Sequence, residues 1–359
     1  MKIAIVGSQG VPANYGGFES LVENLIGDKK SPDIEYTVFC GGKDYESHLK
    51  EYKGASLRYI PLHANGAQGI FYDILSMISC IGKGYDAVLV LGVSGCIFLP
   101  IFRLLFKKKI VVNIDGLEHR RDKWGKIAKQ FLLFSEKCAV RFADIVVADN
   151  KTIKDYVRET YSKDAELIAY GGDHALREVS GKEAAEVLQK YNLNAGSYAI
   201  TVCRIEPENN CHIILDAFSS SKQNLVFIGN WNRSEYGKSL KEKYSCYDNI
   251  KIIDPIYDLD VLYVLRSNAG IYVHGHSAGG TNPSLVEAMY MGVPIVAFDV
   301  IYNRETTHGE AMYFANAGEL SKILLSGFSN SLIGKSMIQI AGMEYTWSVI
   351  VKKYEAILK

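Results

Sequence analysis

The sequence predicts an α/β fold of two domains, each built on a doubly wound parallel sheet. Its 359 residues exceed what a single hydrophobic core usually organises, so two domains are expected. The chain opens with a short apolar run, a glycine-rich loop and a segment of helix length, which is the start of a Rossmann-like unit. Short apolar runs and helix-length segments then alternate along both halves, as is typical of parallel sheets covered by helices.

The composition excludes several classes of protein. Lysine plus arginine and aspartate plus glutamate each number 40, so we expect no nucleic-acid partner. Seven scattered cysteines without metal-ligand spacing are expected to be reduced thiols in a cytoplasmic protein. An apolar stretch over residues 87–102 is broken by glycine and proline and is too short to span a membrane. The chain enters its first strand at once, so we expect no signal peptide.

The first half contains a series of expected strands with polar residues after one of them. These strands cover residues 2–6, 36–39, 57–60, 87–91, 110–114, 145–148 and 166–169. Ligands of such sheets bind beyond the carboxyl ends of the strands. Asp115, Glu118 and His119 follow the strand over residues 110–114 and are therefore expected in a ligand site. The alternative is that Asp115 only caps a helix.

The loop after the first strand is suited to binding phosphate. Gly16 and Gly17 stand just before an expected helix, so their backbone amides can face an anion. A dinucleotide fingerprint would need G-x-G-x-x-G joined tightly to the helix. Gly7 and Gly10 are instead separated by two residues, and Pro12 interrupts the expected helix, which argues against a dehydrogenase. A plain loop is the alternative interpretation of the two glycines.

The second half repeats the alternation and contains a second anion-binding loop. Its expected strands cover residues 198–204, 225–228, 250–253, 269–273 and 294–298. A glycine-rich loop over residues 279–283 leads into an expected helix over residues 284–291, whose first amides are expected to be free for an anion. Glu287, one turn inside that helix, is placed to accept hydrogen bonds from ribose hydroxyl groups. The pattern predicts a diphosphate cradle with contacts from Thr281, Asn282, Ser284 and Leu285.

Charged residues at two other places in the second half have different interpretations. Arg204 ends the expected strand over residues 198–204, and its guanidinium group is a planar fork that suits phosphate oxygens. A structural salt bridge is the alternative role for Arg204. Asp258 and Asp260 form an Asp-x-Asp pattern that can bind metal, but they precede an amphipathic helix and are interpreted as capping residues. We expect no metal and no cofactor.

An aromatic and basic segment over residues 107–142 predicts a possible contact with an anionic membrane surface. A helix expected over residues 122–142 places apolar side chains at helical spacing beside several lysines. The alternative is a helix whose apolar side chains belong to the core and whose lysines face solvent. The apolar positions are Trp124, Ile127, Phe131, Phe134 and Cys138.

The second half resembles a known enzyme family. The motif Gly-x-x-Asn-Pro-Ser-Leu-Val-Glu-Ala-Met-x-x-Gly-x-Pro-Ile-Val-Ala, over residues 279–297, resembles the nucleotide-sugar site of retaining glycosyltransferases of family four, which have the two-domain GT-B fold. Members usually carry two glutamates separated by seven residues; here Glu287 is the second and Gly279 replaces the first. A lysine that usually grips the donor diphosphate beside Arg204 is replaced by Asn209.

The first half resembles one bacterial branch of this family, the cell-wall and capsule rhamnosyltransferases. Tyr-Gly-Gly-Phe-Glu, residues 15–19, is typical of the branch, and so is Asp-Gly-Leu-Glu, residues 115–118, followed by basic residues and Lys123-Trp124. The resemblance implies catalytic roles for Asp115, Glu118 and Arg204. It also implies contacts with the sugar or the acceptor from Glu19, Asp115, His119, Gly279 and Gly280.

The resemblance also implies an organisation and a reaction. An acceptor-binding domain is expected over residues 1–173, facing a nucleotide-sugar-binding domain over residues 174–340 across a cleft, with a helix over residues 341–359 that returns to the first domain. The implied reaction moves rhamnose from dTDP-rhamnose to a lipid-linked glycan of the cell surface, with a donor phosphate oxygen taking the acceptor proton. A UDP-sugar donor, a nucleotide-sugar 2-epimerase and an inactive sugar-nucleotide-binding subunit are the alternatives.

Overall fold

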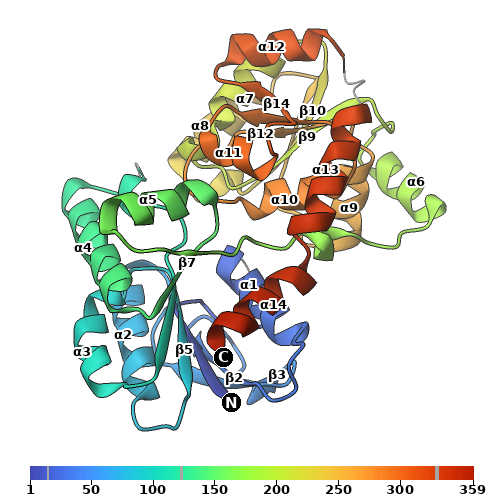
Figure 1. The fold of residues 1–359 in the computed structure, drawn as a ribbon. Coiled ribbons are helices and arrows are strands. Elements are labelled where there is room, and N and C mark those ends of the chain that lie inside the picture. The colour runs from blue at the N-terminus through green and yellow to red at the C-terminus, as the bar shows by residue number, and fades with distance from the viewer. Residues whose placement is uncertain (14–15, 122–123, 328–330) are drawn as a thin grey trace. The chain divides into compact units, whose positions relative to one another are not determined.

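The computed structural model describes residues 1–13, 16–121, 124–327 and 331–359, apart from the side chain of Ala67. The chain forms two compact units (Figure 1). The first comprises Met1–Tyr170 together with Trp347–Lys359, and the second comprises Gly171–Thr346. Among the described residues, no helix combines the length and the hydropathy that a membrane span requires. The seven cysteines are free thiols.

The first unit is built on an eight-stranded sheet with the order β3-β4-β2-β1-β5-β6-β7-β8. Neighbouring strands are parallel except for the antiparallel pair β3 and β4. The strands expected from the sequence are confirmed, and the short edge strand β3 was not foreseen. The strands are β1 (Lys2–Val6), β2 (Glu35–Gly41), β3 (Glu51–Tyr52), β4 (Ala55–Ile60), β5 (Ala87–Leu91), β6 (Lys109–Asn113), β7 (Ile145–Ala148) and β8 (Glu166–Leu167).

Helices cover both faces of this sheet. The connections from β4 to β5, β5 to β6 and β6 to β7 all run in one direction, so the right-handed crossover rule places α2, α3 and α4 on the same face. Figure 1 shows these three helices on one side of β5 and α1 with α14 on the other. The helices are α1 (Gly17–Gly27), α2 (Gly69–Cys80), α3 (Leu99–Leu105), α4 (Lys126–Phe142), α5 (Lys151–Tyr161) and α14 (Trp347–Leu358).

The helix α14 is part of the core of the first unit. Its apolar side chains, among them Trp347 and Leu358, belong to the same buried cluster as the strands β1 and β2. Asn113 at the end of β6 donates a hydrogen bond to the hydroxyl of Tyr354 over 2.7 Å. The buried carboxylate of Glu355 accepts hydrogen bonds from the backbone of Lys30 and the hydroxyl of Ser31.

The second unit has a six-stranded sheet, parallel throughout, with the order β11-β10-β9-β12-β13-β14. Its strands are β9 (Tyr198–Val202), β10 (Asn224–Ile228), β11 (Ile250–Ile253), β12 (Ile271–His274), β13 (Ile295–Phe298) and β14 (Met312–Phe314). Its helices are α6 (Gly181–Lys190), α7 (Cys211–Ser219), α8 (Glu235–Tyr244), α9 (Leu259–Ser267), α10 (Pro283–Met289), α11 (Ile301–Thr306), α12 (Ala317–Leu325) and α13 (Ser331–Glu344).

Two boundaries in the second unit differ from the expected ones. The first strand ends at Val202, so Arg204 lies in the loop beyond it rather than inside the strand. The helix α10 ends at Met289, and Gly292 after it has a positive φ of 70°, which glycine adopts without strain. Asp258 caps the helix α9 through its side chain, as the sequence predicts.

Candidate functional site

The first turn of α10 is capped by Asn282. The side chain of Asn282 accepts a hydrogen bond from the amide of Ser284 over 2.9 Å, and the backbone carbonyl of Asn282 accepts one from Leu285 over 3.0 Å. The prediction that these first amides are free is therefore wrong, because the asparagine satisfies them internally. Thr281, just before the cap, is buried.

The backbone explains why glycine stands at position 279. Gly279 has a φ of 89°, a conformation that residues with a side chain adopt only under strain. The loop therefore turns here without presenting the carboxylate that the family resemblance would place at this position. Gly280, the next residue, is buried.

Glu287 on α10 is held by two basic side chains of the second unit. Its Oε2 lies 2.7 Å from the guanidinium of Arg266 on α9, and its Oε1 lies 3.3 Å from Nε2 of His174. Burial acts to raise the pKa of Glu287, but Arg266 and then His174 outweigh it and hold the pKa at about 2. Glu287 is therefore an ionised carboxylate with one protein partner on each oxygen.

Arg204 is half-exposed and only loosely paired. Its side chain is 41% exposed, and its guanidinium lies 3.8 Å from the carboxylate of Glu208. A contact of this length at the surface contributes little to stability, so the salt-bridge interpretation explains little of this residue. Asn209, which replaces the lysine of the family pattern, is buried, donates to the carbonyl of Arg204 over 2.7 Å and contacts Nδ1 of His276 over 2.7 Å. It fixes the backbone from which the arginine projects.

In the first unit, Asp115 lies at the carboxyl end of β6. Its φ of 57° is left-handed, its amide donates to the side chain of Asn113, and Tyr170 donates to its carboxylate over 3.4 Å. The 3₁₀ turn Glu118–Arg120 that follows has Leu117 at its start, so the alternative that Asp115 caps a helix is wrong. A residue in this conformation turns the chain away from the strand.

The residues after Asp115 are tied to the protein. Glu118 forms an ion pair with Arg121, and its Oε2 accepts a hydrogen bond from the indole of Trp124 over 3.2 Å. Nδ1 of His119 lies 2.9 Å from a carboxylate oxygen of Glu136 on α4. Lys123, part of the motif that resembles the rhamnosyltransferase branch, lies outside the described residues.

The side chain of Glu19 packs against the glycine loop of the first unit. Gly16 precedes α1 with a φ of 126°, Gly17 is its first residue, and Tyr15 lies outside the described residues. A side chain on Gly16 would collide with the carboxylate of Glu19. That carboxylate is buried and accepts a hydrogen bond from the amide of Gln9 over 2.7 Å. Burial raises the pKa of Glu19, and the nearby charge of Asp115 adds to the rise.

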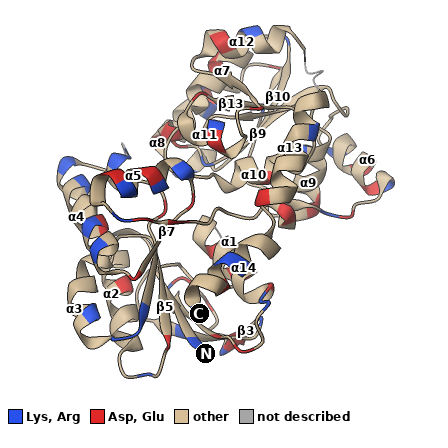
Figure 2. Cartoon of the chain, in the orientation of Figure 1, with Lys and Arg blue, Asp and Glu red and all other residues tan. Residues whose placement is uncertain are grey.

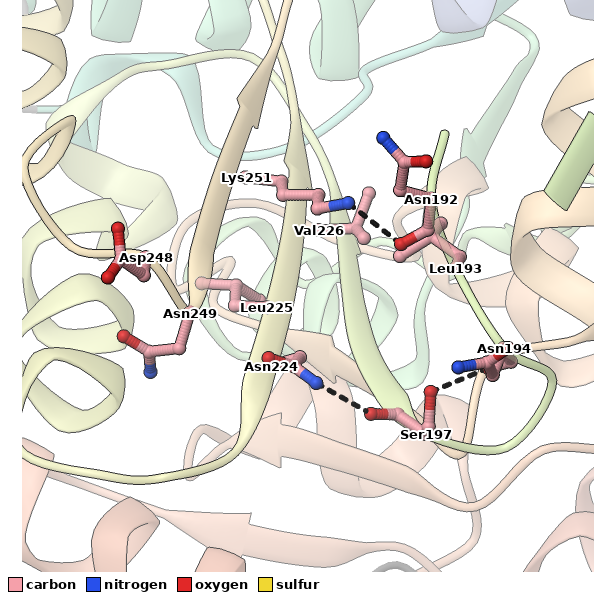
Figure 3. Close-up of a pocket in the computed structure, with 10 residues that line it drawn as sticks. All are labelled: Asn192, Leu193, Asn194, Ser197, Asn224, Leu225, Val226, Asp248, Asn249 and Lys251. Carbon is pink, nitrogen blue, oxygen red and sulfur yellow. Dashed lines mark hydrogen bonds between the residues drawn. The ribbon is translucent and has the colours of Figure 1, made fainter. Parts of the chain in front are cut away.

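A polar pocket lies at the amino ends of β9, β10 and β11, whereas Arg204 lies beyond the carboxyl end of β9. Figure 3 shows the amine of Lys251 directed at the carbonyl of Asn192. This hydrogen bond is 2.9 Å long. The same amine donates to the carbonyl of Tyr191 over 2.6 Å, so the lysine ties two segments of the unit. Within the described part of the chain, no group of three His, Cys, Asp or Glu side chains is arranged to hold a metal ion.

Comparison with known proteins assigns both halves. Residues 1–173 match the family model described as a domain of unknown function, DUF1972, and residues 185–316 match the model described as glycosyl transferases group 1. The chain therefore combines a DUF1972 domain with a group 1 glycosyltransferase domain. No curated protein sequence matched it.

Solved structures show the same fold. This glycosyltransferase matches the sucrose-phosphate synthase of Thermosynechococcus elongatus with a TM-score of 0.83 and 17% identity, over 99% of its own chain and 98% of the other. It matches HepE of Anabaena, solved in complex with UDP and glucose, with a TM-score of 0.79 and 16% identity, over 100% and 99%. A glycosyltransferase from Rickettsia africae matches with a TM-score of 0.72 and 16% identity, over 100% and 98%. The expected GT-B fold is confirmed.

Several residues around the candidate site of the glycosyltransferase were not found from the sequence. Arg266 and His174 hold Glu287, and Glu136 holds His119. Each lies on a different element from its partner, so no local pattern reveals the pair. The sequence offered one signal: Glu136 is the single acidic residue of α4, and it lies on the face of that helix that the structure shows to be buried.

The aromatic and basic segment of the glycosyltransferase is not a core helix throughout. The helix α4 begins at Lys126 rather than at residue 122, and residues 122–123 lie outside the description. Ile127 is 85% exposed, and Trp124 and Phe134 are also exposed, so the core interpretation is wrong for them. The buried face of the helix carries Leu132, Ser135, Glu136, Cys138, Ala139 and Val140. This face differs from the expected row of apolar side chains because it includes Ser135 and Glu136, whose polar atoms form hydrogen bonds within the protein.

Proposed function

We propose that this glycosyltransferase moves rhamnose from dTDP-rhamnose onto a lipid-linked glycan acceptor in the synthesis of a bacterial cell-surface polysaccharide, with retention of configuration. The observation that carries the choice of sugar is Gly279, which replaces the family's glutamate and has a φ of 89° that disfavours any side chain there. A 6-deoxy sugar has one hydroxyl group fewer to bind, so it suits a site that has lost a carboxylate. The motifs around Gly16 and Asp115 support the same donor.

The proposed roles follow from charge and exposure. Arg204 stabilises the leaving diphosphate, since it is half-exposed and weakly paired. The backbone at Gly16, Gly17 and Thr281 approaches the phosphates, while the amides of Ser284 and Leu285 contribute less because Asn282 already satisfies them. Asp115 and Glu118 orient the acceptor, and a donor phosphate oxygen takes its proton. No metal or cofactor has a part in this proposal.

Glu287 is proposed to bind the nucleoside, and its partners favour a deoxyribose. Ribose offers two vicinal hydroxyl groups to a carboxylate, whereas the 2′-deoxyribose of dTDP offers one. Both oxygens of Glu287 already have a protein partner, and His174 lies on the one that is not bound to Arg266. His174 therefore occupies one of the two acceptor sites of Oε1 and competes with a second sugar hydroxyl for that oxygen.

We expect wild-type protein to bind dTDP at least roughly tenfold more tightly than UDP, and His174→Ala to lose most of that preference, because one lone pair of Glu287 becomes available again. Calorimetric titration of dTDP, UDP, dTDP-rhamnose and UDP-glucose measures both. His308→Ala is a matched control, since His308 also pairs with a glutamate, Glu344, at 3.2 Å. Equal preference in wild type and His174→Ala would contradict the role of this histidine.

A UDP-sugar donor is the second candidate. The HepE structures that share this fold were solved with UDP and with UDP-glucose. Tighter binding of UDP-glucose than of dTDP-rhamnose in the same titration would favour this candidate and overturn the proposed sugar.

The proposed lipid-linked acceptor is supported by an apolar and basic surface on the first unit, formed by α2, α3 and α4. Phe71 on α2 is 64% exposed and Leu104 on α3 is 67% exposed, and both lie on the same side of the sheet as Ile127 on α4. The acidic residues of these helices, Asp73 and Glu136, are buried. The exposed charges on these helices are therefore basic. Figure 2 marks lysine and arginine positions on α3 and α4 in blue. An anionic lipid surface matches both properties.

Vesicles test this surface directly. We expect sedimentation with vesicles containing phosphatidylglycerol, weaker sedimentation at high salt, and little with phosphatidylcholine alone. The double variant Leu104→Glu with Ile127→Glu is expected to bind roughly tenfold more weakly or worse, because it removes apolar area and adds repulsion. Leu325→Glu, at an equally exposed apolar position on α12, is the matched control. Unchanged binding of the double variant would exclude this surface.

A further inference from the structure

A buried carboxylate in the first unit collects three hydrogen bonds. Glu136 on α4 is 1% exposed. Its Oε1 accepts from the hydroxyls of Tyr156 and Tyr161 on α5, over 2.8 and 2.7 Å. Its Oε2 lies 2.9 Å from Nδ1 of His119. Three elements, the 3₁₀ turn Glu118–Arg120, α4 and α5, therefore converge on one side chain.

The donors and acceptors of this cluster determine where the imidazole carries its hydrogen. Burial raises the pKa of both Tyr156 and Tyr161, so each remains a hydroxyl that donates to Oε1. The other oxygen, Oε2, can then only accept, which requires a hydrogen on Nδ1 of His119. In the neutral imidazole Nε2 is left with a lone pair.

The second ring nitrogen is available to a ligand. The side chain of His119 is 13% exposed, and among the residues that the structure describes Nε2 has no hydrogen-bond partner. His119 lies beyond the carboxyl end of β6, in the segment that begins with Asp115, where ligands of parallel sheets bind. Arg120, the next residue, has its guanidinium 4.8 Å from the ring centre of Tyr156 and so braces the same cluster.

We propose that Glu136 is a positioning residue: it fixes the Nδ1–H tautomer of His119 so that Nε2 accepts a hydrogen bond from a sugar hydroxyl group. This inference rests on the proposed function, since it assumes a sugar ligand at this edge of the sheet. The hydroxyl belongs either to the donor sugar or to the acceptor glycan, and the same nitrogen suits both. A purely structural cluster would need the hydrogen bond to Glu136 but would not need Nε2.

Two substitutions separate these roles. His119→Asn keeps an amide donor near the position of Nδ1 and removes Nε2. Glu136→Gln keeps an acceptor for the tyrosines but turns an N–H group toward Nδ1, which forces the hydrogen of His119 onto Nε2. Tyr161→Phe is the matched control, because it removes one hydrogen bond of similar length from the same carboxylate and leaves His119 in place.

The tautomer is measured by the ¹⁵N chemical shifts of the histidine ring. We expect an Nδ1–H imidazole at position 119 in wild type and Tyr161→Phe, and an Nε2–H imidazole in Glu136→Gln. An Nε2–H tautomer in wild type would overturn the proposal. This measurement does not depend on the identity of the donor, so it stands apart from the proposed function.

Binding and transfer then show whether the nitrogen is used. We expect His119→Asn and Glu136→Gln to lose about tenfold to a hundredfold in sugar transfer, and Tyr161→Phe to keep transfer while melting a few degrees lower. A loss confined to binding of dTDP-rhamnose, with dTDP binding intact, assigns the hydroxyl to the donor. A raised acceptor KM with unchanged donor binding assigns it to the acceptor. Normal transfer by a folded His119→Asn would overturn the proposal, whereas failure of wild type to bind dTDP-rhamnose would overturn only the proposed donor.

Discussion

Arg204→Ala is expected to lower sugar transfer by about a hundredfold or more and to remove the thermal stabilisation that a nucleoside diphosphate gives the wild-type protein. The reason is the arrangement at the end of β9. The lysine of the family pattern is replaced by the buried Asn209, and the amides of Ser284 and Leu285 are satisfied by Asn282. Arg204 is then left with a larger share of the leaving-group charge than one residue usually bears.

A thermal-shift series with dTDP, dTDP-rhamnose and UDP measures this effect, since a ligand at a hundredfold excess over its Kd stabilises by about 2.7 kcal/mol. Arg158→Ala is the control, because Arg158 is an exposed arginine on α5 paired with Asp164 at 2.8 Å. Arg204→Lys should recover part of the binding, since it keeps the charge and loses the bidentate geometry. An unchanged shift in Arg204→Ala would place the diphosphate elsewhere.

Glu287→Leu is expected to destabilise the second unit by about 3–5 kcal/mol, because it leaves the guanidinium of Arg266 buried without its partner. Urea denaturation at neutral pH measures the loss. Arg266→Met in the Glu287→Leu background should recover much of the stability, because it removes the unpaired charge. Full stability of the single variant would show that another group compensates Arg266.

The same pair has a defined pH dependence. Its two basic partners, which outweigh the effect of burial, hold the pKa of Glu287 at about 2, below the ordinary value of 4.5. A lowered folded-state pKa stabilises the protein above the unfolded-state value, and that stabilisation is lost as the pH falls toward the folded-state pKa. The difference between wild type and Glu287→Gln is therefore expected to be constant above about pH 5 and to shrink between about pH 4.5 and 2.

Much of the fold could be predicted because buried parallel strands are short apolar runs. The expected ranges 87–91, 145–148 and 250–253 coincide with β5, β7 and β11. The strands β3 and β14 were missed because they are only two and three residues long and lie at sheet edges. Their pairing is determined by the neighbouring strand, and such a short segment carries no periodicity of its own.

A site residue could be predicted where its own type indicates its role. It could not be predicted where the role depends on a partner that is distant in the sequence. A glycine at 279 and an arginine at 204 are visible in the sequence. The internal cap by Asn282 was overlooked, although asparagine before a helix is a known capping signal. The partners of Glu287 and His119 could not be found, because Arg266 and Glu136 meet them only through the tertiary fold.

The position of α14 has a consequence for how this protein is made and recombined. Residues 347–359 complete the core of the first unit, whereas the matched DUF1972 domain covers residues 1–173. During translation, residues 1–170 of the first unit are synthesised first. Residues 347–359, which complete its core, are synthesised only after the whole second unit. An exchange of the first domain between relatives must likewise carry these residues with it. Without them, Tyr354 would no longer meet Asn113, and the strands β1 and β2 would expose part of their apolar face.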